Sequence, residues 1–321
     1  MQADIELLKA FEKGLDPEKP QESAIPARVL GYGEISTIFE IQVESAKGMA
    51  FKRMPIFKTQ NEVRDYEKLY HDYNAVLEKT IGIKVPPYGF VWFISDRGNI
   101  VAFDIQQKLK SESIGNRAIH FMDIDNVRKL FLAVLRDLNK LWDFNGENPQ
   151  FAVGIDGQIS NWSIADFAPS SPQITPDTRL VYIDTSTPLM KENGIERLDP
   201  ELFLRSAPSF LLWLIRWLFL DSVMTRYYDA RLVTIDLIAN LYKEQRSDLV
   251  PPLVQAANDF FGGEGSTVGI KPLTTKEVNS YYREDAFIWT LFLAMRRFDR
   301  WLHKHILHRP YIYILPGHIK R

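Results

Sequence analysis

Four short groups of residues, in a fixed order along the 321-residue chain, have backbone or side-chain groups suited to phosphate chemistry. The first is the run Gly31-Tyr32-Gly33-Glu34-Ile35-Ser36. Glycines in such a turn allow backbone N–H groups to approach phosphate oxygens closely. The same pattern also occurs in plain β-hairpins, so the run gains meaning only from the groups that follow it.

The second group is Ala50-Phe51-Lys52, which lies in the next predicted strand. A lysine on a strand beside a glycine turn can reach α- and β-phosphates as a point charge. The helix that follows offers two carboxylates, Glu62 and Glu67, either of which could pair with Lys52 and orient it. The alternative is an ordinary exposed strand lysine.

The third and fourth groups supply candidates for a base and for metal ligands. Asp156 and Asn161 are separated by the spacing Asp-x-x-x-x-Asn, and the apolar strand Val181-Tyr182-Ile183 ends on Asp184. An aspartate such as Asp156 can accept a proton from an attacking hydroxyl, while an asparagine and a strand-end carboxylate can bind Mg²⁺. The alternative for Asp184 is a turn or N-cap residue, because Thr and Ser follow it.

The residues around the first two groups predict a small sheet interrupted by one helix. Alternating apolar residues and turn signals indicate strands within 27–45 and 47–57 and again at 88–95 and 99–106. Between these strands, residues 61–79 have apolar side chains at helical spacing. The predicted order is therefore three strands, one helix and two strands.

Helices dominate the rest of the sequence. Ile124–Phe144 carries apolar residues on one helical face, and most of the chain from Leu198 to about Ile306 has helical character. Short strand-like pieces occur around 155–164 and 180–183, separated by the polar, proline-rich loop Ala168–Asp177. These elements would position the third and fourth groups at the start of the helical part.

Taken together, the four groups resemble the protein-kinase-like superfamily, and specifically its small-molecule branch of aminoglycoside- and choline-kinase-like phosphotransferases. The resemblance covers about residues 27–220. It implies a glycine-rich loop for phosphates, an Ala-x-Lys lysine, an ion-pair glutamate, an adenine-binding hinge, a catalytic aspartate and two metal ligands. In that order the residues are Gly31, Gly33 and Ser36, then Lys52, Glu62, Phe103–Leu109, Asp156, and Asn161 with Asp184.

The resemblance implies an α+β fold with a small β-rich lobe and a larger, mainly α-helical lobe. We expect an N-terminal helix and linker over residues 1–26, a nucleotide-binding lobe over 27–108 and a helical lobe over 109–321. The implied activity is ATP- and magnesium-dependent phosphoryl transfer to a hydroxyl or amine of a small molecule. The alternatives are an inactive, nucleotide-binding interaction module and, on the same fold, nucleotidyl transfer.

Several positions depart from the family pattern. Gly154 stands where the family usually has histidine, Ile155 replaces an arginine of regulated protein kinases, and Thr185-Ser186 follows the metal aspartate. Only ten residues separate Lys52 from Glu62, which keeps Glu67 as a candidate partner. Ala207-Pro208-Ser209 lacks the glutamate that ends a protein-kinase activation segment, and this favours a small-molecule acceptor over a protein.

Composition narrows the possible partners and the compartment. The formal net charge of -2 argues against a broad nucleic-acid surface, and the absence of cysteine excludes disulfides and agrees with a cytoplasmic protein. The N-terminus lacks the features of a signal peptide. Two apolar stretches, Pro208–Leu220 and Ala286–Met295, are shorter than a membrane span and predict buried helices.

The C-terminal residues 296–321 are basic and aromatic, and they contain four of the six histidines. His303 and His305 would point to different faces of a helix, which argues against a shared metal ion. Attraction to an anionic partner is a second interpretation. The third, which we expect, is a solvated helix end with Trp301 packed inward.

Overall fold

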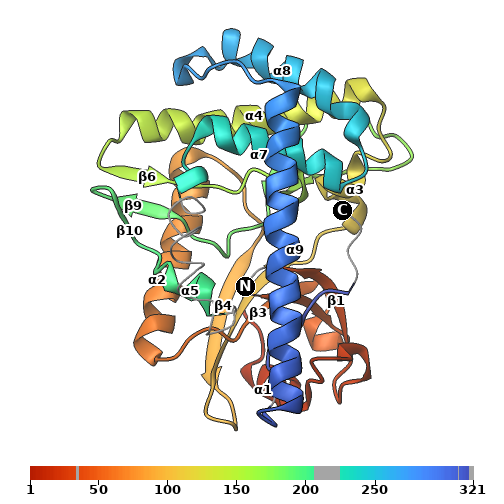
Figure 1. Cartoon of the computed structure of the whole chain (residues 1–321), viewed down its shortest axis with the longest axis vertical. Helices are drawn as coiled ribbons and strands as arrows, with labels where there is room; N and C mark the ends of the chain where they lie inside the picture. The colour runs from red at the N-terminus through yellow and green to blue at the C-terminus, as the bar shows by residue number, and fades with distance from the viewer. Residues whose placement is uncertain (34–35, 206–224, 310, 318–321) are drawn as a thin grey trace.

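The computed structural model of the chain describes residues 1–33, 36–205, 225–309 and 311–317. Its parts divide into a five-stranded sheet with one long helix and a larger region of helices (Figure 1). Two stretches singled out in the sequence, Pro208–Leu220 and Ala207-Pro208-Ser209, lie outside the described residues.

The sheet is antiparallel throughout and has the strand order β1-β2-β3-β5-β4. Its strands are β1 (Ala27–Tyr32), β2 (Thr37–Ile41), β3 (Met49–Met54), β4 (Tyr88–Ile94) and β5 (Ile100–Gln107). All five were predicted, with small differences at the ends. Tight turns at Gly48 and Gly98 adopt positive φ angles of 77°, which glycine tolerates without steric cost.

Helix α2 (Gln60–Ala75) runs between β3 and β4, as the spacing predicts. It begins with a capping box in which the Thr59 side chain accepts from the Glu62 amide while the Glu62 carboxylate binds the Thr59 amide. A single π-helical segment, Val76–Ile81, extends the helix before the left-handed Gly82 ends it. The buried face of α2 therefore packs on the sheet from a fixed starting point.

Neighbouring residues of β3 face opposite sides of the sheet, because side chains alternate along a strand. Phe51 is fully buried in a small core with Leu8 and Phe11 of helix α1 (Ile5–Gly14). Lys52 faces the other side, where α2 and the helical lobe lie. A one-residue shift in register would exchange the two, so the core under α1 fixes where the lysine points.

The helical lobe is built around the long helix α4, whose apolar face was predicted. Its helices are α3 (Gly115–Ala118), α4 (Ile124–Glu147), α5 (Glu201–Leu204), α7 (Ala230–Lys243), α8 (Val250–Gly262) and α9 (Thr275–His305). Short 3₁₀ turns lie at Pro20–Glu22, Glu44–Ala46, Ser111–Ser113, Ile159–Asn161, Ser247–Leu249 and Ser266–Val268.

The chain between α4 and α5 forms two small sheets. A two-stranded sheet joins β7 (Trp162–Ile164) to β8 (Leu180–Tyr182), which lie within the two strand-like pieces that the sequence predicts. A three-stranded sheet joins β6 (Phe151–Val153), β9 (Met190–Glu192) and β10 (Ile195–Glu196). These three strands were not predicted, because each has only two or three residues and their sequence has no clear alternation.

The structure confirms the predicted α+β, two-lobed fold, with the strand–helix–strand order of the kinase-like resemblance. Helix α9 contacts both lobes (Figure 1). Near its start Glu277 accepts from Arg231 of α7 at 2.7 Å, and near its end Lys304 lies 3.1 Å from Glu18 beside the sheet. The helix therefore ties the two lobes together along one side.

Two predictions about which side chains of α9 are buried were wrong. Ala286–Met295 is helical as predicted, but Phe287 is 68% exposed, and Trp301, expected to pack inward, is 48% exposed. Only Val278, Leu293 and Arg296 of the described side chains of α9 are buried, so most of the helix stays at least partly accessible. Among the described residues, none of the helices has both the length and the apolar character to cross a membrane.

Candidate functional site

A cleft of about 260 Å³ opens between the sheet and the helical lobe. Its lining includes most of the residues that the sequence singled out, although they come from four separate stretches of chain. These residues are Gly33, Ser36, Lys52, Asp156, Asn161 and Asp184. The other two predicted residues, Gly31 and Glu62, do not line it.

The glycine turn contributes Gly33 and Ser36, whose backbones are joined by a Gly33 N–H to Ser36 carbonyl hydrogen bond of 3.0 Å. A Cβ atom on Gly33 would lie 2.6 Å from Ser36 Oγ, so a larger residue there would force the Ser36 hydroxyl to move. Ser36 Oγ is buried and has no hydrogen-bond partner among the described residues. A buried hydroxyl without a partner suits an incoming acceptor such as a phosphate oxygen. Gly31, in contrast, is a strand residue opposite Ile38.

Lys52 meets the metal-ligand candidate directly. Its ammonium group lies 2.7 Å from Asp184 Oδ1 and also donates to Ser186 Oγ, which in turn donates to Asp184 at 3.1 Å. The side chains of Lys52 and Asp184 are only 16% and 24% exposed. Burial alone would raise the pKa of Asp184, but the charge and hydrogen bonds of Lys52 and Ser186 outweigh it and keep that pKa below its ordinary value.

The expected pairing of Lys52 with Glu62 is not formed. Glu62 occupies the first turn of α2, where it binds the Lys58 amide at 2.8 Å and the Arg205 guanidinium at 2.5 and 3.1 Å. Hydrogen bonding to Arg205 lowers the pKa of Glu62 to about 2. The capping position thus turns the carboxylate away from the cleft. The other candidate, Glu67, accepts instead from Trp92 Nε1 at 3.1 Å.

Strand pairing brings Asn161 beside Asp184. Trp162 of β7 pairs with Tyr182 of β8, so the residues just outside the pair also meet, and Ile183 N–H donates to the Asn161 carbonyl at 2.8 Å. The Asn161 side-chain amide then donates back to the Asp156 carbonyl at 3.2 Å. The short sheet therefore gathers both predicted metal ligands and the predicted base at one edge.

Asp156 lies in a strongly acidic neighbourhood. Burial, followed by the negative charges of Asp236 and Asp184, raises the pKa of Asp156 to about 7. One of its oxygens accepts from the Gln158 amide at 3.1 Å, which fixes the side chain's orientation. A carboxyl group with a pKa near neutrality can take up and release a proton at physiological pH.

Gly154, the position where the resembled family has histidine, is tightly enclosed by neighbouring side chains. A Cβ atom there would lie 3.0 Å from the ring of Tyr228 and 3.0 Å from Leu189 Cβ. Its carbonyl accepts from Tyr73 OH at 2.9 Å, which anchors the loop to α2. Gly154 is thus held by packing and by a backbone hydrogen bond from neighbouring segments.

The sequence reasoning missed three polar residues at or beside the cleft. Asp236 of α7 accepts from Gln158 at 3.0 Å, Ser186 joins the Lys52 pair, and Asp104 of β5 is 1% exposed and accepts from Tyr70. Burial raises the pKa of Asp104 to about 7. An acid inside an apolar run, as at both aspartates, was the signal that could have identified them.

Only part of the predicted hinge, Phe103–Leu109, lies where it could contact the adenine ring of a nucleotide. Its first residues belong to β5, and Phe103 is fully buried, 6.3 Å from Phe11 between ring centroids. That side chain faces α1 and not the cleft. Of the predicted hinge, only the residues after Gln107, where the strand ends, lie in the chain segment that leads from the sheet to the helical lobe.

The oxygen ligands at the cleft fit a magnesium ion that arrives with phosphate. Asp184 and Asn161 offer one carboxylate and one amide oxygen, and Mg²⁺ is commonly held by one or two carboxylates together with phosphate oxygens and water. Across the described residues, His, Asp and Glu side chains nowhere gather in a group of three that could hold a metal ion by themselves. The donor set therefore suits a shared site and not a closed structural metal centre.

The chain matches one family model, and the solved structures that resemble it do so at low sequence identity. A model described as a family of unknown function (DUF6206) matches residues 16–300, and no curated protein matches the sequence. The structure titled "WaaP in complex with acyl carrier protein" is 13% identical with a TM-score of 0.34, over 84% of this chain and 99% of that one. The GDP complex of wild-type aminoglycoside 2'-phosphotransferase-IIIa is 12% identical with a TM-score of 0.35, over 82% and 100%. At these values neither similarity indicates what this chain binds.

Proposed function

The chain belongs to the DUF6206 family of unknown function, and from the geometry of its cleft we propose that it is an ATP- and magnesium-dependent phosphotransferase. The acceptor in this proposal is a hydroxyl or amine group of a small molecule. The lack of cysteine fits a cytoplasmic setting for this activity.

One observation carries the proposal: Lys52, Asp156, Asn161 and Asp184 line one cleft beneath the glycine turn. Phosphoryl transfer needs a cation for the phosphates, oxygen ligands for magnesium, and a base for the acceptor, all within one site. A set of residues maintained only for packing would have no reason to collect these three functions. The unpartnered Ser36 hydroxyl adds a hydrogen-bond donor on the phosphate side.

Each residue has a distinct role in the proposed reaction. Lys52 would donate to phosphate oxygens, and Asn161 and Asp184 would hold magnesium, which would supply positive charge beside the phosphates. The acceptor oxygen or nitrogen forms a bond to the γ-phosphorus, the bond from that phosphorus to the β–γ bridging oxygen breaks, and ADP leaves with its electron pair. The proton of the acceptor passes to the Asp156 carboxylate.

The first test is a thermal-shift titration with ATP, with and without Mg²⁺. Nucleotide that binds only the folded state raises the melting temperature by mass action. We expect a magnesium-dependent rise in the wild type that is reduced in Asp184→Ala. Because this variant also loses the Lys52 ion pair, Asn161→Ala serves as a second variant. An equal rise in all three proteins would contradict the assigned metal ligands.

The second test separates transfer from binding. ADP release is measured against a panel of amino alcohols, sugars and amines, and the phosphorylated product is identified by mass. Asp156→Ala should abolish turnover while keeping the ATP-dependent thermal shift. The control is Asp166→Ala, because Asp166 is an exposed aspartate outside the cleft whose side chain pairs with Arg179 at 2.8 Å. Undiminished turnover in Asp156→Ala would refute its role.

One contact favours the alternative of a nucleotide-binding module without turnover. Arg205 holds Glu62, so no glutamate of α2 orients Lys52, and Tyr66 OH instead donates to the Ser186 carbonyl at 2.6 Å. This alternative predicts the magnesium-dependent thermal shift without any product from the acceptor panel. Nucleotidyl transfer would yield a product heavier by a nucleoside monophosphate.

A further inference from the structure

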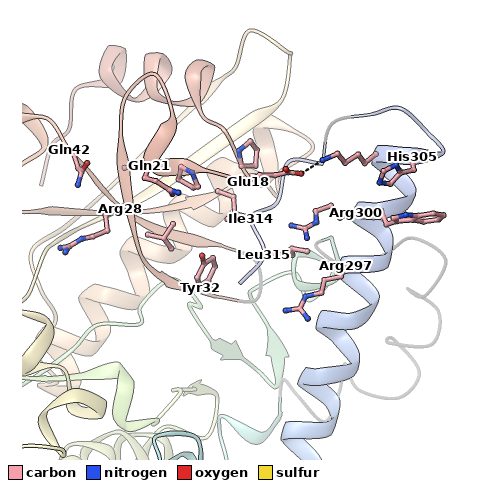
Figure 2. Close-up of a pocket in the computed structure, with 16 residues that line it drawn as sticks. Glu18, Gln21, Arg28, Tyr32, Gln42, Arg297, Arg300, His305, Ile314 and Leu315 are labelled. Carbon is pink, nitrogen blue, oxygen red and sulfur yellow. Dashed lines mark hydrogen bonds and ion pairs between the residues drawn. The ribbon is translucent and has the colours of Figure 1, made fainter. Parts of the chain in front are cut away.

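A second hollow, separate from the cleft, lies between the edge of the sheet and the C-terminal part of α9 (Figure 2). Its volume is about 840 Å³, which is larger than the cleft and within the range of small-molecule sites. On one side are β1 and the linker before it, and on the other are α9 and the segment 311–317. Tyr32 lines both this hollow and the cleft.

The permanent charges that line the hollow are mostly positive. Four cations, Arg28, Arg297, Arg300 and Lys304, face one carboxylate, Glu18. Arg28 is paired with Glu40 at 2.6 Å and lies at the end of the hollow away from α9, and Lys304 is paired with Glu18 at 3.1 Å (Figure 2). Two of the four positive charges are thus neutralised within the protein.

The two remaining cations, Arg297 and Arg300, have no carboxylate within ion-pair distance among the described residues. Both are on α9 and extend from it toward the side of the hollow where Tyr32 and Leu315 lie (Figure 2). Arg297 donates to the carbonyls of Pro316 at 3.4 Å and Gly317 at 2.9 Å, so its guanidinium is held in place. They are three residues apart, which places them on the same face of a helix.

We propose that this hollow is a binding site for a phosphate monoester, held by Arg297 and Arg300. Guanidinium groups bind phosphate oxygens in a bidentate manner, and a phosphate monoester carries a charge of about -1.5 to -2 at pH 7, which matches two uncompensated arginines. Beside them the ring of Tyr32, which lines the hollow and is 42% exposed, suits an apolar or aromatic group attached to the phosphate. The site does not depend on the reaction proposed for the cleft.

The test uses phenyl phosphate as the soluble probe in isothermal titration calorimetry with the full chain. We expect saturable binding that weakens at least about tenfold in Arg297→Gln/Arg300→Gln, because both guanidinium contacts are lost. The matched control is Arg283→Gln, an exposed arginine of the same helix that does not line the hollow. Circular dichroism checks folding. Since Arg297 also holds the C-terminal segment, Arg300→Gln alone is measured too.

Two further experiments show where the probe binds and which kind of molecule carries the phosphate. Lys52→Ala should bind phenyl phosphate as the wild type does; loss of binding there would place the probe in the cleft and overturn the proposal. Vesicles of phosphatidylcholine with phosphatidic acid present the same monoester on a membrane. Sedimentation with them, lost in Arg300→Gln, would identify a lipid headgroup, while binding of the soluble probe alone would identify a free metabolite. Binding of neither, or unchanged binding in both arginine variants, would refute the site.

Discussion

Lys52 of the sheet and Asp184 of the helical lobe lie 2.7 Å apart although 132 residues separate them in sequence. The pair is mostly buried and shares the Ser186 hydroxyl. It joins the two lobes at the point where the proposed reaction takes place. In the proposed complex Lys52 binds phosphate and Asp184 binds magnesium, so both partners keep an opposite charge nearby.

The pH dependence of turnover should report Asp156. Because the pKa of Asp156 is raised to about 7, the deprotonated base prevails only above that pH. We expect kcat/KM to rise with a slope of one in log units up to about pH 7 and to level off above it. Asp156→Asn should remove this limb together with most of the activity, whereas Asp166→Asn should keep it. A flat wild-type profile from pH 5 to pH 7 would contradict the assignment.

Asp104 should make folding less favourable as the pH rises. Burial raises its pKa from 3.8 to about 7, so between these values the folded state keeps a proton that the unfolded state has released. Its contribution to the free energy of unfolding is therefore complete below about pH 4 and is lost toward pH 7, by up to about 1.4 kcal/mol per pH unit.

Urea unfolding of wild type and Asp104→Asn at pH 4.5, 6 and 8 measures this contribution. The amide cannot ionise, so the variant should gain stability relative to the wild type at each step in pH. Asp156 titrates in both proteins and cancels in the difference. A constant difference across the three pH values would show that Asp104 does not titrate in this range.

Gly33→Ala should weaken nucleotide binding by about tenfold, because the new Cβ would displace Ser36 from the cleft wall. The crowding is specific: the nearest atom would be Ser36 Oγ at 2.6 Å, with Lys52 Cε at 3.8 Å. Gly146→Ala is the matched control, since nothing lies within 4 Å of a Cβ added there. Calorimetric titration with ATP and Mg²⁺ measures both, and equal affinities would remove the glycine turn from the site.

Glu62→Gln should lower stability and leave nucleotide binding intact. It replaces the charge that Arg205 binds, at a cost of about 1–2 kcal/mol at pH 7, given that both side chains retain some exposure. The pKa of Glu62 is lowered to about 2, so this stabilisation is present above about pH 4.5 and declines as the pH falls toward 2. Urea unfolding at pH 7 and pH 3 measures it.

The control for this variant is Glu284→Gln, an exposed glutamate of α9, which should leave stability unchanged. The ATP-dependent thermal shift of Glu62→Gln should equal that of the wild type. Its disappearance would mean that Glu62 moves to Lys52 when nucleotide binds.

The amino-acid sequence by itself determined the order of elements and most of the candidate site. Alternating strands and the helical period of α2 and α4 are local properties, and local properties can be read along a chain. The same holds for the spacing of Asp156 and Asn161 and for Asp184 at the end of a strand. Their neighbours in sequence already fixed which element carries each of them.

Only the tertiary structure decided which of these residues meet. The capping geometry of α2 places Glu62 against Arg205 and leaves Lys52 to pair with Asp184, although the family resemblance implied a pair of Lys52 with Glu62. Likewise, α9 leaves Phe287 exposed, because burial of a helix depends on what covers it and not on its own apolar content. Contacts between distant segments depend on packing. The sequence showed that residues 296–321 are basic, but only the packing of α9 beside β1 places two of their arginines at one hollow.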